Sequence, residues 1–299
     1  MRVLVSGATG FIGTALIPAL IGEGHEVLAG TRHPDRYRGP GFAVRFDVED
    51  LSSLDTALEG ADAAYYLVHG MAGSGDFVAR DREAAEAFGA AARRHEVKVI
   101  YLGGLGDRQA SAARSAHLRS RHEVGEVLRE RAETVELQAA IVIGTGSIAF
   151  EILRQLVHRL PVMVCPRWVA TRSQPIGVDD MVRYLVAGLG LESGAYQVGG
   201  ADVLSYEEMM DHYAALTGRR RVVVKVPVLT PGLSAHWIGL VTDQSPKVAR
   251  ELAEGLSVEV IVTDDRIRSL VPFEPVSFDE AVRRAVASPA NPASPAGSR

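Results

Sequence analysis

Residues 2–13 read RVLVSGATGFIG, a short apolar run that leads into three glycines, Gly7, Gly10 and Gly13. A strand, a glycine-rich turn and a helix in this order bring backbone amides and the positive end of a helix dipole close to a pyrophosphate. The spacing G-x-x-G-x-x-G departs from the commoner G-x-G-x-x-G, so the flanking strand and helix carry the prediction, and a tight turn without ligand is the alternative. The expected nucleotide-binding residues of this turn are Gly7, Thr9, Gly10, Phe11, Ile12 and Gly13.

The same alternation of apolar runs and helical stretches continues along the chain. Helical patterns begin near residues 11, 51, 76 and 117. Strand-like runs separate them, a pattern typical of βαβ units with a parallel sheet and helices on both faces. We therefore predict an α/β fold: a doubly wound Rossmann-type parallel sheet with a smaller α+β C-terminal substrate domain. The further runs are 26–32, 42–46, 63–69, 97–104 and 135–144.

The alternation of strand-like and helical segments changes after residue 150, which predicts two parts with different binding roles. Residues 1–150 are expected to form the NAD(P)-binding domain, with a return segment at about 174–200. The substrate-binding part is expected to comprise 151–173 and 201–287. The tail from residue 288 to 299 is rich in Pro, Ala and Ser, a composition that favours disorder.

Composition limits the classes of partner. Of the 299 residues, 47% are hydrophobic and 23% charged, and the net charge of −5 argues against a nucleic-acid partner, which needs a basic surface. Cys165 is the single cysteine and a strand-like run begins at residue 2, so we expect no disulfide, no signal peptide and a cytoplasmic location. The apolar run at 229–242 is too short to cross a membrane. No metal site is expected, and a homodimer is left open.

The second strand indicates which dinucleotide binds. NAD-specific sites place an acidic residue about 20 positions after the glycines, whereas residues 29–36 read AGTRHPDR, with Arg32 in that place. A guanidinium pairs well with a 2′-phosphate, which favours NADP(H) over NAD(H), assisted by Thr31 and Arg36. An exposed loop cation is the alternative. After the third strand, Asp47 and Val48 are placed to bound the adenine ring.

Taken together, these segments resemble atypical short-chain dehydrogenases/reductases of the NmrA-like NAD(P)H-binding family, in the bacterial branch of SDR oxidoreductases. The resemblance extends over nearly the whole chain. The group that it indicates includes reductases, epimerase-like enzymes, accessory subunits of membrane complexes and redox sensors. It implies that backbone at Leu67, Val68 and His69 lies near the nucleotide ribose, although His69 could equally be structural. It rests on VSGATGFIG, AYYLVHGM, VIYLGGLG, HLRSRHEVGEVLRE, IVIGTGS, LPVMVCPRWV, SQPIGVDDM and YQVGGADVLSYEEMM.

The expected catalytic segment departs from this family. Catalytic members have a Tyr and a Lys four residues apart, where this chain has His117 and Arg121, and an earlier Ser or Thr, where it has Gly103 and Gly104. In one interpretation His117 donates the proton, because histidine titrates near 6.5 and a phenol near 10, and Arg121 binds ribose or a substrate oxyanion. In the other, catalysis has been lost and both side chains merely contact a nucleotide.

The substrate is expected between the carboxyl edge of the sheet and the C-terminal part. Aromatic and apolar wall residues favour an apolar carbonyl, a conjugated enone or a quinone, which makes the leading hypothesis an NADP(H)-dependent oxidoreductase. The alternatives are a non-catalytic NAD(P)-binding redox sensor or accessory subunit, and redox-neutral chemistry with a tightly held cofactor. The proposed wall residues, each of which could instead belong to the core, are Met71, Phe77, Phe150, Leu153, Trp168, Trp237 and Ile238.

Overall fold

A computed structural model provides the structure of the chain. Two predicted segments, the apolar run at 229–242 and the tail at 288–299, lie outside the part that it describes. Side chains are described for these residues except 162–165, 167, 168 and 222–225. The described residues are 1–68, 77–106, 115–160, 162–165, 167–220, 222–225, 243 and 254–287.

Seven parallel strands form the main sheet, in the order β11-β6-β5-β4-β1-β2-β3. The order reverses between β1 and β4, and ligands of doubly wound folds bind at such a switch point, outside the carboxyl ends of the strands. Both faces are covered, so the central strands are continuous apolar runs. The strands are β1 (Arg2–Ser6), β2 (Glu26–Thr31), β3 (Phe42–Arg45), β4 (Ala63–Tyr66), β5 (Lys98–Gly104), β6 (Thr134–Ala139) and β11 (Gly194–Val198).

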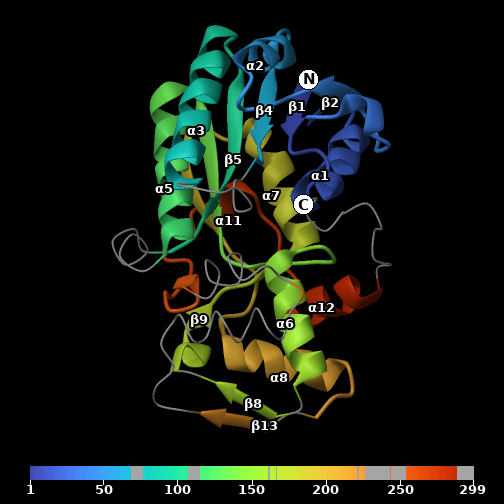
Figure 1. Ribbon diagram of the computed structural model, residues 1–299, viewed down its shortest axis with the longest axis vertical. Helices are drawn as coiled ribbons and strands as arrows, with labels where there is room; N and C mark the ends of the chain where they lie inside the picture. The colour runs from blue at the N-terminus through green and yellow to red at the C-terminus, as the bar shows by residue number, and fades with distance from the viewer. Residues whose placement is uncertain are drawn as a thin grey trace.

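Two layers of helices enclose this sheet, each with its own core. On one face, α1 (Phe11–Gly22) packs beside α7 (Val178–Ala187). The opposite face is covered by α2 (Leu51–Leu58), α3 (Phe77–Arg94) and α5 (Ala116–Arg131), as Figure 1 shows. Helices α1, α2, α3 and α5 begin within one residue of the starts predicted from the sequence. The predicted α/β doubly wound fold is therefore confirmed.

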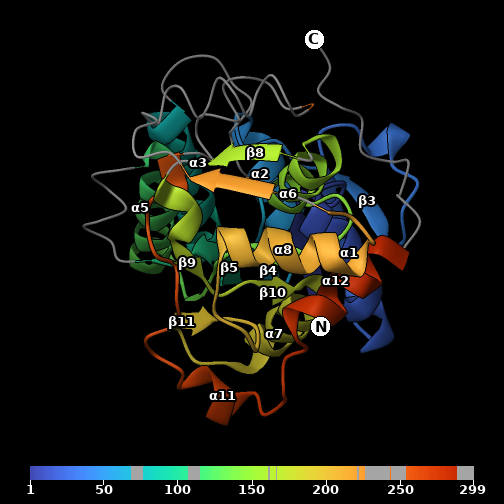
Figure 2. The same cartoon turned by 90° about the horizontal axis from the view of Figure 1, so that it is seen from below.

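The remaining elements form a smaller α+β part below the carboxyl edge of the sheet (Figure 1). Seen from below in Figure 2, α8 lies beside α12 and α6, and these helices share a core. The return segment supplies β11 to the main sheet. The division into a nucleotide-binding and a substrate-binding part stays a prediction. The helices of the smaller part are α6 (Ile148–Arg159), α8 (Tyr206–Leu216) and α12 (Phe278–Ala287), whereas α11 (Ile267–Leu270) packs against β11 of the main sheet.

Short strands outside the main sheet form separate pairs. Strand β13 pairs in parallel with β8. The run at 173–178 divides between β9 and β10, which pair with β12 and β7. These strands are β7 (Val142–Ile143), β8 (Val162–Cys165), β9 (Arg172–Ser173), β10 (Ile176–Gly177), β12 (Leu204–Ser205) and β13 (Val222–Lys225); the 3-10 turns are η1 (Pro34–Arg36), η2 (Arg167–Ala170) and η3 (Gly188–Gly190).

Candidate functional site

The glycine-rich turn between β1 and α1 leaves no room for side chains. Gly7 has φ of 68°, a left-handed conformation that favours glycine, and a Cβ on it would lie 3.1 Å from the carbonyl oxygen of Leu67. The Gly10 amide donates to the Gly7 carbonyl at 2.9 Å and closes the turn. A Cβ on Gly13 would collide with that same carbonyl oxygen. The backbone is therefore exposed at the start of α1.

The start of α1 suits an anion. Gly10 is the N-cap, no side chain caps the helix, and its first turn has no acidic residue. The first backbone amides of a helix have no partner within it, so these donors point toward the space in front of the turn. The positive end of the helix dipole adds to their attraction for negative charge. A pyrophosphate fits this cradle, which a Cβ at Gly13 would distort.

Ser6 is a binding-site support that the sequence reasoning missed. Its hydroxyl donates to the Tyr65 carbonyl at 2.8 Å and accepts from the Leu67 amide at 3.0 Å. These bonds join the carboxyl end of β1 to that of β4, the two strands at the switch point. The Leu67 backbone is thus held beside Gly7, where the family resemblance places the ribose. A buried serine at a strand end was the available signal.

A cavity of about 580 Å³ opens at this edge of the sheet. This volume is within the usual range for small-molecule sites. The cavity begins at the glycine turn and extends past the ends of β4, β5 and β6 to α5, α6 and α8. Of the expected site residues, those on its wall are Gly7, Gly10, Phe11, Ile12, Gly13, Leu67, Val68, Gly103, Gly104, His117, Arg121 and Leu153.

The part of the cavity beyond the sheet is an apolar chamber. Helix α6 presents Ile148, Ile152 and Leu156 to it, residues spaced by four that share one helix face. Met210 from α8 and Leu256 add to the wall. We call this region, walled by these residues, the apolar chamber.

Helix α5 brings His117 and Arg121 to the cavity wall. Ser115 caps the helix, since its hydroxyl accepts from the Leu118 amide at 3.3 Å. The Arg121 guanidinium donates to the Leu102 carbonyl at the end of β5 and lies 5.6 Å from the centre of the Tyr101 ring. The Tyr101 hydroxyl in turn donates to the Arg121 carbonyl at 3.1 Å. The cation is therefore fixed in place before any ligand arrives.

A buried carboxylate explains the missing hydroxyl at position 103. Glu136 on β6 is 1% exposed, forms an ion pair with Arg129 and accepts from Gln138 at 3.1 Å. A Cβ on Gly103 would lie 2.5 Å from its Oε1, and a Cβ on Gly125 of α5 would also collide with the carboxylate. The carboxylate thus occupies the space that a side chain at 103 needs.

Position 104 differs from position 103. A Cβ on Gly104 would lie 3.4 Å from Leu118 and 3.5 Å from Arg121, which is ordinary van der Waals contact. The wall beside Arg121 therefore has room for a small side chain that the chain does not supply.

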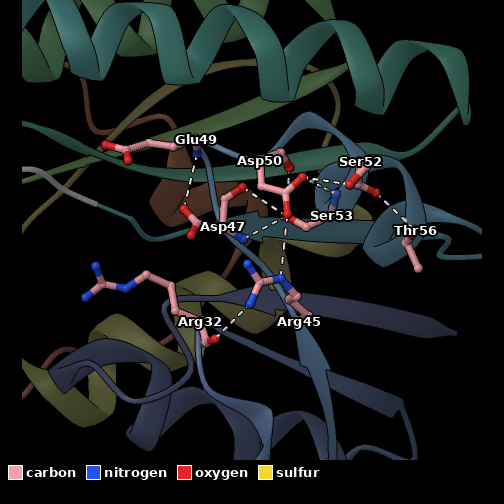
Figure 3. A network of polar contacts seen from close by, with 8 residues as sticks. All are labelled: Arg32, Arg45, Asp47, Glu49, Asp50, Ser52, Ser53 and Thr56. Atoms are coloured by element: carbon pink, nitrogen blue, oxygen red, sulfur yellow. Dashed lines mark hydrogen bonds and ion pairs between the residues drawn. The ribbon is translucent and has the colours of Figure 1, made fainter.

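Two arginines lie on adjacent strand ends, where the sequence predicts contact with a 2′-phosphate, and we call this region the specificity end (Figure 3). Arg32 follows β2, and Arg45, at the end of β3, is paired in register with Thr31. Arg45 donates to the Arg32 carbonyl at 3.5 Å and lies 3.6 Å from the Asp50 carboxylate. Among the described residues, the Arg32 guanidinium makes no hydrogen bond or ion pair. It is thus available to an anion.

The loop above these arginines is held by its own polar contacts (Figure 3). The Asp47 amide donates to the Ser53 hydroxyl at 2.9 Å, and that hydroxyl donates to the Asp47 carbonyl at 3.0 Å. Asp50 caps α2, and its pKa lies below the usual value, mainly because Ser52 donates to the carboxylate. The expected adenine-binding residues Asp47 and Val48 therefore sit on a well-defined loop.

The other expected residues lie outside the cavity wall. Thr9 is exposed on the glycine turn, and Phe150 is 1% exposed in the core of the smaller part, 5.9 Å from the Tyr213 ring. Phe77 begins α3 in a buried position. Thr31, Arg32, Arg36, Asp47 and Val48 lie at or beyond the ends of β2 and β3, apart from the residues that line the cavity. His69, Met71, Trp237 and Ile238, and the side chain of Trp168, lie outside the described residues.

Three buried tyrosines, Tyr66, Tyr101 and Tyr206, line the cavity and were not expected there. Burial raises the pKa of each phenol, so all three are neutral hydrogen-bonding groups at pH 7. Tyr66 and Tyr101 lie within strand-like runs, where the sequence pattern marks them as core. Tyr206 begins a helix, and nothing in its neighbourhood in the sequence distinguishes it.

Comparison with known proteins identifies the first half of the chain. Residues 7–143 match the family described as NAD(P)H-binding. The NAD(P)H-binding resemblance predicted from the sequence is thereby confirmed, and binding of a pyridine nucleotide agrees with the cradle at α1.

Relatives and solved structures extend the likeness over most of the chain. An uncharacterized protein of Mycobacterium tuberculosis is 27% identical over 237 residues, 77% of this chain but 25% of that protein. The chain thus spans about a quarter of that relative's length. The mitochondrial NADH dehydrogenase [ubiquinone] 1 alpha subcomplex subunit 9 of Arabidopsis thaliana is 25% identical, with 69% of this chain and 56% of the subunit covered.

Solved structures that are more distant in sequence share the fold of nearly the whole chain. A nucleoside-diphosphate-sugar epimerase from Staphylococcus aureus has a TM-score of 0.76 at 15% identity, covering 95% of this chain and 100% of its own. A short-chain dehydrogenase/reductase superfamily protein from Agrobacterium tumefaciens with bound NAD has a TM-score of 0.71 at 18% identity, covering 95% and 96%. The chain shares its fold with both of these proteins. In the described part of the chain, no helix is long and apolar enough to cross a membrane, and no cluster of His, Cys, Asp or Glu could hold a metal.

Proposed function

We propose that the protein is an NADP(H)-dependent oxidoreductase, cytoplasmic in location, that acts on an apolar carbonyl, enone or quinone. The observation that supports this most strongly is one cavity whose wall includes the glycine turn, the apolar chamber, His117 and Arg121. An enzyme of this kind needs a nucleotide and a substrate in one enclosed space, with a proton source on its wall. The Arg32 guanidinium has no partner among the described residues, which supports recognition of a 2′-phosphate beyond the end of β2.

The nucleotide, when bound, supplies or accepts the hydride. The glycine turn and the first amides of α1 hold the pyrophosphate, and Ser6 keeps the Leu67 backbone beside them. His117 donates the proton to the carbonyl oxygen as it gains negative charge, which a histidine does readily near neutral pH. Arg121, held by the Leu102 carbonyl and the Tyr101 ring, contributes a fixed positive charge toward that oxygen.

The direct test is turnover by His117 variants. NADPH oxidation is followed with a panel of apolar ketones, enones and quinones. Removing a general acid costs about 10²–10⁴ in rate, so His117→Ala is expected to lower kcat by that factor while the nucleotide Kd stays within about twofold. His212→Ala, on the surface of α8 and away from the cavity, is the matched control. Wild-type turnover by His117→Ala would contradict the role of this histidine.

A redox sensor or accessory subunit is the alternative proposal. It is supported by the absence of the usual Tyr, Lys and Ser, by the subunit name of the Arabidopsis relative, and by the engagement of Arg121 with the protein's own carbonyl. It predicts nucleotide binding without turnover by any substrate in the panel, a clear difference in affinity between NADP⁺ and NADPH, and no effect of His117→Ala on either.

A further inference from the structure

One face of α6 forms a side of the apolar chamber over most of the length of the helix. Ile148, Ile152 and Leu156 follow one another at intervals of four residues, and each of them lines the cavity. The eight residue steps from the first to the last span about 12 Å along the helix axis. Helix α6 leads away from the main sheet in Figure 1. The chamber is therefore longer than a single six-membered ring, and it extends away from the nucleotide site.

The two ends of the chamber differ in burial. Ile148, at the start of α6, is 37% exposed, whereas Leu156, two turns further along, is 4% exposed. The start of α6 lies beside the glycine turn, since a Cβ on Gly146 would be 3.7 Å from the ring of Phe11. Leu156 and Met210, in contrast, belong to the core of the smaller part. The chamber thus begins next to the nucleotide site and ends against packed core.

The wall of the chamber offers no charged partner to a ligand. The described residues of α6, α8 and 255–260 that line the cavity include no Asp, Glu, Lys, Arg or His. The Ser147 hydroxyl is used to cap α6, where it accepts from the Phe150 amide at 3.5 Å. Burial raises the pKa of the Tyr206 phenol, which is therefore neutral. A charged end group would lose its hydration here without gaining a partner, so the part of a ligand that enters is uncharged and largely hydrocarbon.

A single alkyl chain suits this space better than a ring system. The whole cavity has a volume of about 580 Å³ and must also hold the nicotinamide end of the nucleotide, so a chamber about 12 Å long within it is narrow. The α6 side of the wall consists of Ile, Leu and Ala side chains, which offer no flat face on which a ring system could stack. Met210 opposite them is a flexible side chain that adapts to the shape of what it contacts.

We propose that the apolar chamber binds an unbranched alkyl chain of about ten carbons, the length that spans 12 Å in extended form. The carbonyl group of this substrate lies at His117 and Arg121, on the same cavity wall, and Leu156 and Met210 limit the length of its chain. The inference rests on the proposed function and narrows its substrate class from apolar carbonyl compounds in general to straight-chain aliphatic ketones, aldehydes and enones. A compact quinone would leave the chamber unfilled.

Binding of straight-chain methyl ketones to the NADP⁺-loaded protein tests the proposal. The ketone and NADP⁺ are both in the oxidised state, so no hydride transfer occurs during the titration. From hexan-2-one to dodecan-2-one, calorimetry is expected to show a Kd that falls about fourfold for each added methylene, and the Kd should level off beyond that length. Cyclohexyl methyl ketone, which has the same number of carbons as octan-2-one, should bind more weakly than octan-2-one.

Variants at the closed end test which residues limit the length. Leu156→Ala opens space beyond the end of the chain, so tetradecan-2-one should bind this variant about 15-fold more tightly than the wild type, the gain from two further buried methylenes. Met210→Ala opens the same end from α8 and gives a second test if the first variant does not fold. Val157→Ala is the matched control, because Val157 follows Leu156 in α6 and is 3% exposed in the core but does not line the cavity.

Four outcomes overturn the proposal: a Kd that does not change with chain length, tighter binding of the ring ketone, the same gain in Val157→Ala as in Leu156→Ala, or no binding of any ketone. The test does not depend on turnover. A length dependence that shifts with Leu156, in a protein that oxidises NADPH with no ketone, would support the alkyl-chain site and contradict the oxidoreductase. Turnover of ring ketones without a length dependence would do the reverse.

Discussion

The two ends of the nucleotide-facing cavity wall are built in different ways. At the start of α1 the geometry comes from backbone: Gly7, Gly10 and Gly13 approach one another and Leu67 so closely that side chains are excluded. At the start of α5 it comes from side chains of several strands, because Tyr101, the Leu102 carbonyl and Glu136 determine what lies beside Arg121.

This difference means that the glycine turn tolerates few substitutions, whereas the residues at the α5 end can vary. The glycine turn has one workable backbone path, so a substitution there disturbs both folding and binding. The α5 end is a set of replaceable side chains packed against one another, and the usual catalytic trio can be lost from it without loss of the fold. The glycine turn is therefore fixed by the fold, whereas the chemistry at the α5 end can change without altering it.

The largest effect is expected at Gly13. Gly13→Ala places a Cβ against the Gly7 carbonyl oxygen, where the backbone must move, and should destabilise the protein by about 3 kcal/mol and lower nucleotide affinity more than tenfold. Gly22→Ala, in the same helix with nothing within 4 Å of the added Cβ, is the control and should have little effect. Thermal unfolding and calorimetry measure both. A Gly13→Ala protein of normal stability that binds NADPH normally would mean that the turn has a second backbone path.

The next largest effect sharpens the comparison at the α5 end. Restoring a serine at Gly103 forces it against the buried Glu136 carboxylate and should cost about 1–3 kcal/mol of stability, the usual penalty of overpacking. Gly104→Ser meets ordinary contacts and should stay within about 1 kcal/mol of wild type. Urea unfolding of the two variants tests this. Equal stability of the two would show that Glu136 does not fill the position.

The features that could be predicted from the sequence are those that depend on residues close together in the chain. The glycine spacing, the alternation of elements and the strand-end position of Arg32 were enough for the fold, the turn and the candidate specificity residue. The sequence did not reveal contacts between distant segments. The Ser6 hydroxyl holds the Leu67 amide, and the Glu136 carboxylate fills the space that a side chain at Gly103 would need. The Arg121 guanidinium donates to a carbonyl of β5.

The apolar chamber shows a second limit of sequence reasoning. Helix α6 is apolar on more than one face, because it borders both the cavity and the core of the smaller part. Its periodicity cannot tell the face of Ile148 and Ile152 from that of Phe150, which the structure places in the core. Likewise no sequence pattern separates Tyr206, which lines the cavity, from Tyr213 on the same helix, which does not.

A moderate effect is expected for nucleotide choice at Arg32. Its guanidinium has no partner among the described residues, so its loss should affect the bound phosphate and leave the fold unchanged. Arg32→Ser is expected to weaken NADPH binding about 10-fold, as loss of a charged hydrogen bond does, and to leave NADH binding within about twofold. Calorimetric titration with both nucleotides measures the ratio. Equal weakening of NADPH and NADH would indicate a general contribution to the nucleotide site and would contradict recognition of the 2′-phosphate.

The smallest effect is expected at Arg45, which tests whether the specificity end has one cation or two. Arg45 lies beside Arg32 on the adjacent strand, but its guanidinium is shared with the Asp50 carboxylate at 3.6 Å and the Arg32 carbonyl at 3.5 Å. An exposed ion pair of this kind contributes little to stability, so Arg45→Ser should unfold like the wild type. NADPH affinity should fall about two- to threefold through the loss of one screened charge, and this loss should shrink further at high salt. A loss as large as that of Arg32→Ser would mean that Arg45 leaves Asp50 and binds the phosphate directly, which would make the specificity end, like the α5 end, an arrangement of exchangeable side chains.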